Sequence, residues 1–239
     1  MILILGACGG GGGNNPAVDA STDKMDARVF LDAPPNVPAM ITISGTATEQ
    51  GSGGGTPLPG ATIGIFKTSD ETTALATTTS DAQGNYSLVL TTNGLVVDGF
   101  IKTSKSGYAD NYAYPVKPWE ANTSADPQLL KKGTFDALRF FVGSDMGKGL
   151  VVINVVDASD MPVAGATVSS TPASGKYAYS DASGNPSTSV TATAADGLAF
   201  MLSVPPGQIT ISADKSGATF KSHALNAHAD AFTTTSITE

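Results

Sequence analysis

The chain is poor in the residues that build most catalytic and metal sites. Its 239 residues include one cysteine, two histidines and one tryptophan, and only 14% of them are charged. A single cysteine excludes an internal disulfide. The two histidines, His223 and His228, are five residues apart and fall on opposite faces of a strand, which does not favour zinc.

Basic residues are also scarce. Lysine and arginine number 13 against 21 aspartates and glutamates, so the formal net charge is −8. Binding of nucleic acid needs a basic footprint, so nucleic acid is not expected as a partner. The same charge disfavours electrostatic docking on anionic lipid. No apolar run reaches the roughly 18 residues that a transmembrane helix needs.

Known catalytic motifs are missing as well. The sequence contains no G-x-S-x-G, H-E-x-x-H or P-loop pattern. Oxygen ligands for calcium could come from Asp81, Asn85, Asp181 and Asn185. Turns of this kind use Asp and Asn for backbone reasons alone, so we expect no metal, no cofactor and no enzymatic activity.

The chain contains an internal repeat. The segment Pro57-Leu58-Pro59-Gly60-Ala61-Thr62-Ile63 returns as Pro162-Val163-Ala164-Gly165-Ala166-Thr167-Val168. Thr103-Ser104-Lys105-Ser106-Gly107 returns as Ala213-Asp214-Lys215-Ser216-Gly217. Both pairs of anchors are about one small domain apart, so the repeat predicts two related domains.

Alternation of apolar and polar residues predicts strands in both copies. The predicted inward residues are Ile41, Ile43, Ile63, Ile65, Tyr86, Leu88 and Leu90 in the first copy, and Val151, Ile153, Val155, Leu198, Phe200, Leu202 and Val204 in the second. The second copy can be aligned in two ways. Either Asp196-Gly197 corresponds to the turn before Tyr86, with an insertion after Val168, or the turn 180–185 does.

Together, the strand, the P-x-x-G-A-x-[IV] turn, the glycine turn with its following strand, and K-S-G resemble the carboxypeptidase regulatory-like domain. The resemblance implies a mainly β protein of two transthyretin-like or Ig-like β-sandwiches, at residues 40–118 and 149–239. It implies no catalytic residues of its own, and it groups the chain with carbohydrate-binding-like folds.

A linker is expected between the copies, at residues 119–148. A short helix is predicted from Thr134 to Phe141, because this stretch has few β-branched residues and no proline. We expect the helix to pack Phe135, Leu138 and the pair Phe141–Val142 against a neighbouring domain.

The N-terminus carries a second resemblance. Leu5-Gly6-Ala7-Cys8 looks like the lipobox of bacterial lipoproteins, in which the signal peptide is cleaved before the cysteine and the cysteine is acylated. Residues 1–8 would then be a signal remnant and lipobox, and Cys8 would hold the chain to a membrane. No basic residue precedes the short apolar run, which predicts a translation start upstream of Met1.

Residues 9–39 are rich in glycine, aspartate and proline, which predicts a disordered tether. Such a segment of about 30 residues can reach at most ~100 Å. Gly9, rather than aspartate, follows the cysteine, and resemblance to Gram-negative lipoproteins therefore implies the outer membrane of the cell envelope.

The best candidate ligand-binding residues are aromatic: Tyr108, Tyr112, Tyr114 and Trp119. Tyr112 and Tyr114 share one face of a strand, opposite Ala113, and could stack on a sugar or on a partner protein. The alternative is that these rings seal a sandwich edge or the junction between domains. We therefore expect a non-enzymatic surface lipoprotein that binds a carbohydrate or an envelope protein. The alternatives are a structural spacer or assembly subunit, and an accessory module of a hydrolase.

Overall fold

The computed structural model describes residues 36–50 and 55–239, and these belong to one compact unit. Cys8 and the tether as far as residue 35 lie outside the described residues. Residues 36–39, which were expected in the tether, contact the first repeat: Val37 is buried, and the Thr92 amide donates to the Ala39 carbonyl at 3.0 Å.

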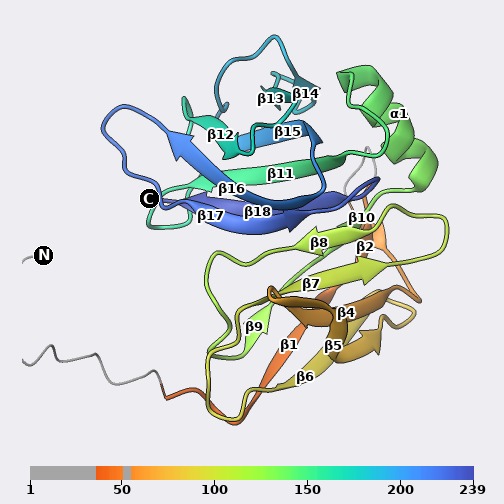
Figure 1. Cartoon of the computed structure of the whole chain (residues 1–239). Coiled ribbons are helices and arrows are strands. Elements are labelled where there is room, and N and C mark those ends of the chain that lie inside the picture. Colours follow the sequence, from red (N-terminus) through yellow and green to blue (C-terminus); the bar gives the residue numbers. More distant parts are fainter. Residues whose placement is uncertain (1–35, 51–54) are drawn as a thin grey trace, which may run out of the picture. The chain divides into compact units, whose positions relative to one another are not determined.

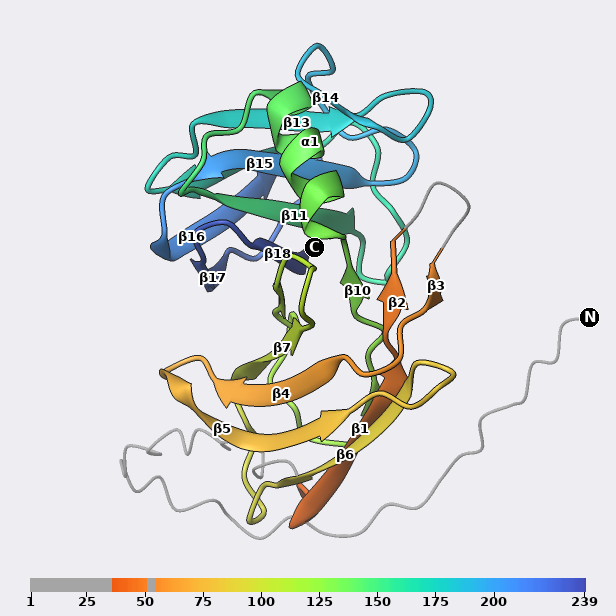
Figure 2. The same ribbon diagram turned by 90° about the vertical axis from the view of Figure 1, so that its right-hand side faces the viewer.

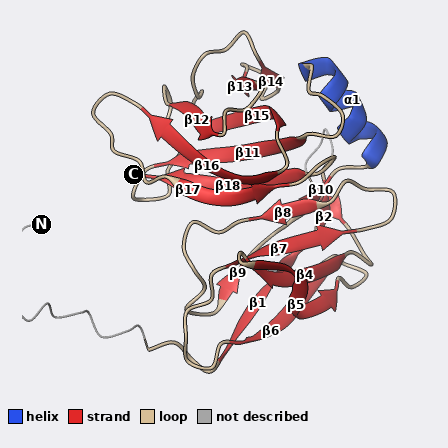
Figure 3. Ribbon diagram, viewed as in Figure 1, coloured by secondary structure: helices blue, strands red, loops and turns tan. Residues whose placement is uncertain are grey.

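The first repeat consists of short strands. They are β1 (Met40–Thr46), β2 (Thr48–Glu49), β3 (Thr56–Pro57), β4 (Thr62–Lys67), β5 (Asp70–Thr79), β6 (Asn85–Thr91), β7 (Gly99–Ser104), β8 (Asn111–Ala113), β9 (Thr123–Ser124) and β10 (Gln128–Leu129). The helix α1 (Lys132–Val142) follows and is the only α-helix of the described residues (Figure 3).

The second repeat follows the helix. Its strands are β11 (Gly149–Val156), β12 (Thr167–Thr171), β13 (Lys176–Ser180), β14 (Pro186–Ser187), β15 (Leu198–Val204), β16 (Gly207–Asp214), β17 (His223–Ala227) and β18 (Phe232–Thr238). The prediction of a mainly β protein with sandwich-like sheets is confirmed.

One nine-stranded sheet runs through both repeats, in the order β14-β13-β15-β11-β18-β8-β7-β4-β5 (Figure 1). The repeats meet where β18 pairs in parallel with β8, with Phe232 opposite Asn111 and Thr234 opposite Ala113. On its other side β18 pairs in parallel with β11. The sequence predicted two separate sandwiches, whereas in the structure they share a sheet.

Each repeat covers this sheet with a smaller sheet of its own. In the first repeat the sheet β6-β1-β9 provides the cover, and in the second β12-β16-β17 does. On β7 the neighbouring residues Phe100 and Ile101 belong to different core clusters: Phe100 packs with the second repeat and Ile101 with the first. Because adjacent residues of a strand point to opposite faces, the two small sheets cover opposite faces of the shared sheet.

The predicted core residues are buried in both repeats, with Leu198 partly so. The faces of β15 need a correction, because this strand is buried on both sides. Ala199 and Met201 lie in the core shared with β16, whereas Phe200 and Leu202 lie in a separate cluster beneath α1. Figure 2 shows the helix lying against this part of the sheet.

The stretch predicted as a linker is largely structured. β9 pairs in parallel with β1, and β10 pairs in parallel with β2, so residues 123–129 add strands to the first repeat. The predicted helix exists and begins two residues earlier than expected, at Lys132. Phe135 is buried and Leu138 packs beside it. The expectation for Phe141 was wrong, since its side chain is 83% exposed.

A buried hydroxyl explains the repeated P-x-x-G-A turn and decides between the two alignments. Ser80 Oγ accepts from the Ala61 amide at 2.9 Å and donates to the Leu58 carbonyl at 2.6 Å. Thr193 Oγ1 accepts from the Ala166 amide at 2.9 Å and donates to the Val163 carbonyl at 2.7 Å. Thr193 therefore corresponds to Ser80, and Asp196-Gly197 leads into β15 as Gln83-Gly84 leads into β6. This is the first of the two alignments, in which β13 and β14 lie in an insertion after Val168.

Candidate functional site

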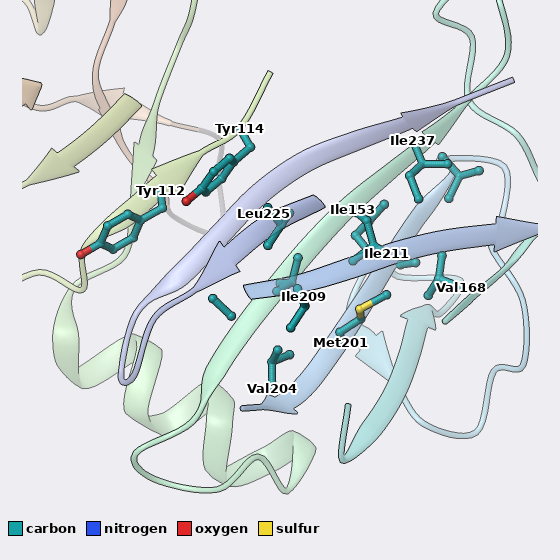
Figure 4. Close-up of a cluster of buried hydrophobic side chains, with 14 of the residues drawn as sticks. Tyr112, Tyr114, Ile153, Val168, Met201, Val204, Ile209, Ile211, Leu225 and Ile237 are labelled. Atoms are coloured by element: carbon teal, nitrogen blue, oxygen red, sulfur yellow. The ribbon is translucent and has the colours of Figure 1, made fainter. Parts of the chain in front are cut away.

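The aromatic residues of β8 are buried at the junction of the repeats. Tyr112 is 9% exposed and Tyr114 is 4% exposed, and both lie in the core cluster of the second repeat. Figure 4 shows their rings together with Leu225 and Ile153 of that cluster. Ala113 packs against the core of the first repeat, which confirms the predicted alternation. The rings do not form an exposed platform for a sugar.

The two tyrosines belong to a row of stacked rings that crosses the junction. The ring centroids of Phe66 and Phe100 are 5.5 Å apart, and those of Phe100 and Tyr114 are 4.8 Å apart. Tyr112 continues the row at a tilt, with its centroid 5.9 Å from that of Phe100, and it stacks on His228, with centroids 3.6 Å apart and planes 12° apart. Offset or parallel rings at these distances pack favourably, so the row joins β4 of the first repeat to the end of β17 in the second.

A carboxylate serves as the polar centre of the same junction. Glu71 Oε1 accepts from the Tyr114 hydroxyl at 3.1 Å and from Asn226 Nδ2 at 2.6 Å. His228 Nε2 lies 3.7 Å from the same oxygen. Burial, with the charge of Glu71, raises the pKa of Tyr114, and burial lowers the pKa of His228. Burial therefore favours the uncharged form of His228, and Glu71 is the hydrogen-bond acceptor at the centre of the junction.

The other two candidate aromatics are also occupied within the protein. The Tyr108 hydroxyl donates to Glu49 Oε2 at 2.6 Å, and Lys131 Nζ lies 2.8 Å from Glu49 Oε1. Trp119 is 6% exposed and lies in the core of the first repeat. Its ring closes over Gly99, where an added Cβ would lie 2.9 Å from Trp119 Cζ3.

The acidic turn residues also serve the backbone. Asp81 Oδ1 accepts from the amides of Gln83 and Asn85 at 2.9 and 2.8 Å. Asp181 Oδ1 accepts from the amides of Ser183 and Asn185 at 2.8 and 3.0 Å. Across the described ranges no group of three or more His, Cys, Asp or Glu side chains is placed to hold a metal ion.

An apolar groove of about 590 Å³ lies beside α1. Leu130 and Leu138 line one part of it, Pro186 another, and Val152, Phe200 and Ala113 contribute from the shared sheet. The groove therefore takes residues from both repeats. A second, more polar pocket of about 370 Å³ includes Trp119 and Asp160. Sequence reasoning did not find the groove, because its residues come from nine separate segments of the chain.

No helix in the described part of the chain is long and apolar enough to cross a membrane. No family model and no curated protein matches the chain.

Several solved structures do match, at low similarity. The Bacillus anthracis TIE protein is 15% identical, with 82% of this chain and 33% of that chain covered and a TM-score of 0.26. The shaft pilin SpaA from Lactobacillus rhamnosus GG is 13% identical, with 83% of this chain and 97% of that chain covered and a TM-score of 0.27. The major pilin RrgB from Streptococcus pneumoniae is 14% identical, with 86% of this chain and 49% of that chain covered and a TM-score of 0.27. The chain spans about a third of the length of the first. TM-scores this low carry no argument about fold or function.

Proposed function

We propose that this chain is a non-enzymatic structural spacer of the bacterial cell envelope, built from two carboxypeptidase regulatory-like repeats that behave as one rigid body. One observation carries the proposal: the shared sheet and the row of stacked rings join the repeats directly. Tyr112 and Tyr114, two of the four aromatic side chains that could have bound a sugar, are used for this joint.

Cys8 is proposed as the lipid anchor of the spacer, on the strength of the lipobox resemblance. Acylation at this position would place the body at the end of the segment that begins at Gly9. The anchor is tested by fractionating cells that express the wild-type chain or Cys8→Ala from the natural translation start. We expect the variant to move from the membrane fraction to the soluble fraction.

Rigidity of the body is tested by pulsed electron spin resonance in the Cys8→Ala background. Spin labels at Thr77→Cys on β5 and Ser183→Cys in the second repeat report the distance between repeats; both positions are exposed. We expect a single narrow distance distribution, unchanged by temperature below unfolding. A broad distribution would refute the rigid spacer, whatever the anchor experiment shows.

The apolar groove favours a second candidate function, binding of a carbohydrate or a protein segment beside α1. Pockets of this size with an apolar lining are common ligand sites. A glycan and peptidoglycan binding screen of the full chain tests it, with Asn154→Trp as a variant that blocks the groove. Asn154 is exposed and lines the groove. Saturable binding that Asn154→Trp abolishes would establish this function. If the full chain binds nothing in the screen, the spacer role is retained.

A further inference from the structure

The outer face of α1 is apolar and uncovered. Phe140 and Phe141 are each 83% exposed, and their rings meet edge to face with centroids 6.2 Å apart. Most large apolar side chains of the described residues are buried or partly buried. Two adjacent phenylalanines exposed to this degree mark an interaction surface more often than an isolated apolar residue does.

One strip of the outward side of the helix lacks charge, and the Lys132–Asp136 ion pair lies beside it. With about 3.6 residues per turn, Gly133, Ala137 and Phe140 lie on one side of the helix, with Thr134 and Phe141 beside them. All five are exposed. The opposite side carries the buried Phe135 and Arg139. Only the last turn of this strip is strongly apolar, where Phe140 and Phe141 stand uncovered.

The residues of this face differ in size along the helix. The two phenylalanines stand in the last turn, and Gly133 stands in the first. A Cβ added at Gly133 would meet nothing within 4 Å. Packing within the chain therefore does not require glycine there, although glycine is a poor helix former. The space above Gly133 is open to a neighbouring molecule.

We propose that α1 docks against α1 of a second copy of this chain, antiparallel and related by a two-fold axis near Ala137. This arrangement places Phe140 and Phe141 of each copy over Gly133 and Thr134 of the other. Large side chains then fill the space left by small ones. The two-fold axis makes the contact self-complementary, so the assembly closes at a dimer.

Charge also favours this occupant. Lys131 and Lys132 lie at the start of the helix, and Asp145 follows its end. The antiparallel pairing brings these lysines, which already pair within their own chain with Glu49 and Asp136, near the negative C-terminal end of the other helix and its Asp145. A lipid surface is favoured less, because the chain carries a net charge of −8. Two helices of this length bury less than the ~800 Å² per partner of a standard interface. We therefore expect a dissociation constant on the order of 10–100 µM.

The pairing is independent of the spacer role and of the anchor, and it is tested with the full-length Cys8→Ala chain. Cys8 is the only cysteine, so this background excludes disulfide dimers. Analytical ultracentrifugation from about 1 µM to 1 mM should show a monomer–dimer equilibrium. Phe140→Ser/Phe141→Ser should raise the dissociation constant about 100-fold, because burying each phenylalanine contributes roughly tenfold.

Two variants distinguish this pairing from general stickiness of the phenylalanines. Gly133→Gln leaves both rings in place and fills the space they would occupy, so it should also weaken the dimer at least tenfold. As a matched control, Leu95→Ser/Val96→Ser removes two exposed apolar residues elsewhere and should leave the equilibrium unchanged. Circular dichroism confirms that each variant is folded.

Disulfide trapping tests the direction of the helices. Ala137→Cys should cross-link to itself under mild oxidation, because this position lies at the two-fold axis. Gly133→Cys should not, since antiparallel pairing separates the two positions beyond the ~7 Å Cα limit of a disulfide. The proposal is overturned by a monomer at all concentrations, by a dimer insensitive to the phenylalanine variant, or by preferential cross-linking at 133. A monomer that binds lipid vesicles through these phenylalanines would overturn it too.

Discussion

Truncating the core of the second repeat should destabilise the first repeat as well. Ile153 lies on β11, is fully buried, and packs in the cluster that also holds Tyr112 and Tyr114. Ile→Ala at such a site costs roughly 2–5 kcal/mol, from lost transfer energy and the cavity left behind. For a body of this size, ~3 kcal/mol lowers the thermal midpoint by about 10 °C.

Trp119 provides the assay, because it is the only tryptophan and lies in the core of the first repeat. If the repeats unfold as one unit, Trp119 fluorescence and far-UV circular dichroism should lose their native signals together. In Ile153→Ala both midpoints should fall by the same amount. Leu75→Ala, at a partly exposed site on β5, is the control and should change stability by less than ~0.5 kcal/mol.

The reasoning would be refuted by two separate transitions. In that case circular dichroism would lose part of its amplitude early in Ile153→Ala, while the Trp119 midpoint stayed at its wild-type value. Such a result would mean that the shared sheet and the stacked rings contribute little free energy to the junction.

Three further predictions concern hydrogen-bonded groups, each measured by urea unfolding. Ser80→Ala and Thr193→Val should each lower the free energy of unfolding by about 1–3 kcal/mol, because an amide and a carbonyl lose their buried partner. A free energy of unfolding equal to that of the wild type in both variants would show that the hydroxyls are not needed. Tyr114→Phe should cost about 1 kcal/mol through the lost hydrogen bond to Glu71, and an unchanged midpoint would count against a role for that bond. Hydrogen bonds from Arg139 and from the Gly147 amide lower the pKa of Asp230 from its ordinary value of 3.8. Because the pKa of Asp230 is lower in the folded state than in the unfolded state, its ionised form stabilises the fold at pH values above the unfolded-state pKa, and this contribution is lost as the pH falls through the folded-state pKa. The free energy of unfolding should therefore decrease below about pH 4, and it should decrease less steeply in Asp230→Asn.

The strand pattern was predictable because it depends on local alternation. Ile41 and Ile43, or Val151 and Ile153, must share a face wherever their strand lies, and the structure buries them as expected. The opposite faces of Tyr112 and Ala113 followed from the same rule. The sequence could also show that the P-x-x-G-A turn is repeated.

The partners of these strands were not predictable in the same way. Nothing in the local pattern of β18 indicates that it pairs with β8, because that pairing joins residues more than a hundred positions apart. The burial of Tyr112 and Tyr114 follows from it. Ser80 and Thr193 were missed for a related reason: each hydroxyl bonds to a turn about twenty or thirty residues earlier, at sequence separations of 19 and 27 to the amide. Comparing the polar residue before each glycine turn could have found them.

The pairing of β18 with β8 also constrains the order of assembly during synthesis. The Thr235 hydroxyl bonds to the Tyr114 carbonyl across a separation of 121 residues. Until β18 has emerged, β8 remains an open strand edge, and such edges are prone to pair with other chains. Contacts this distant in sequence form slowly. A nascent chain therefore carries an unpaired strand edge through about the second half of its synthesis, from β8 to β18, and we expect it to depend on chaperones until its last strand is in place.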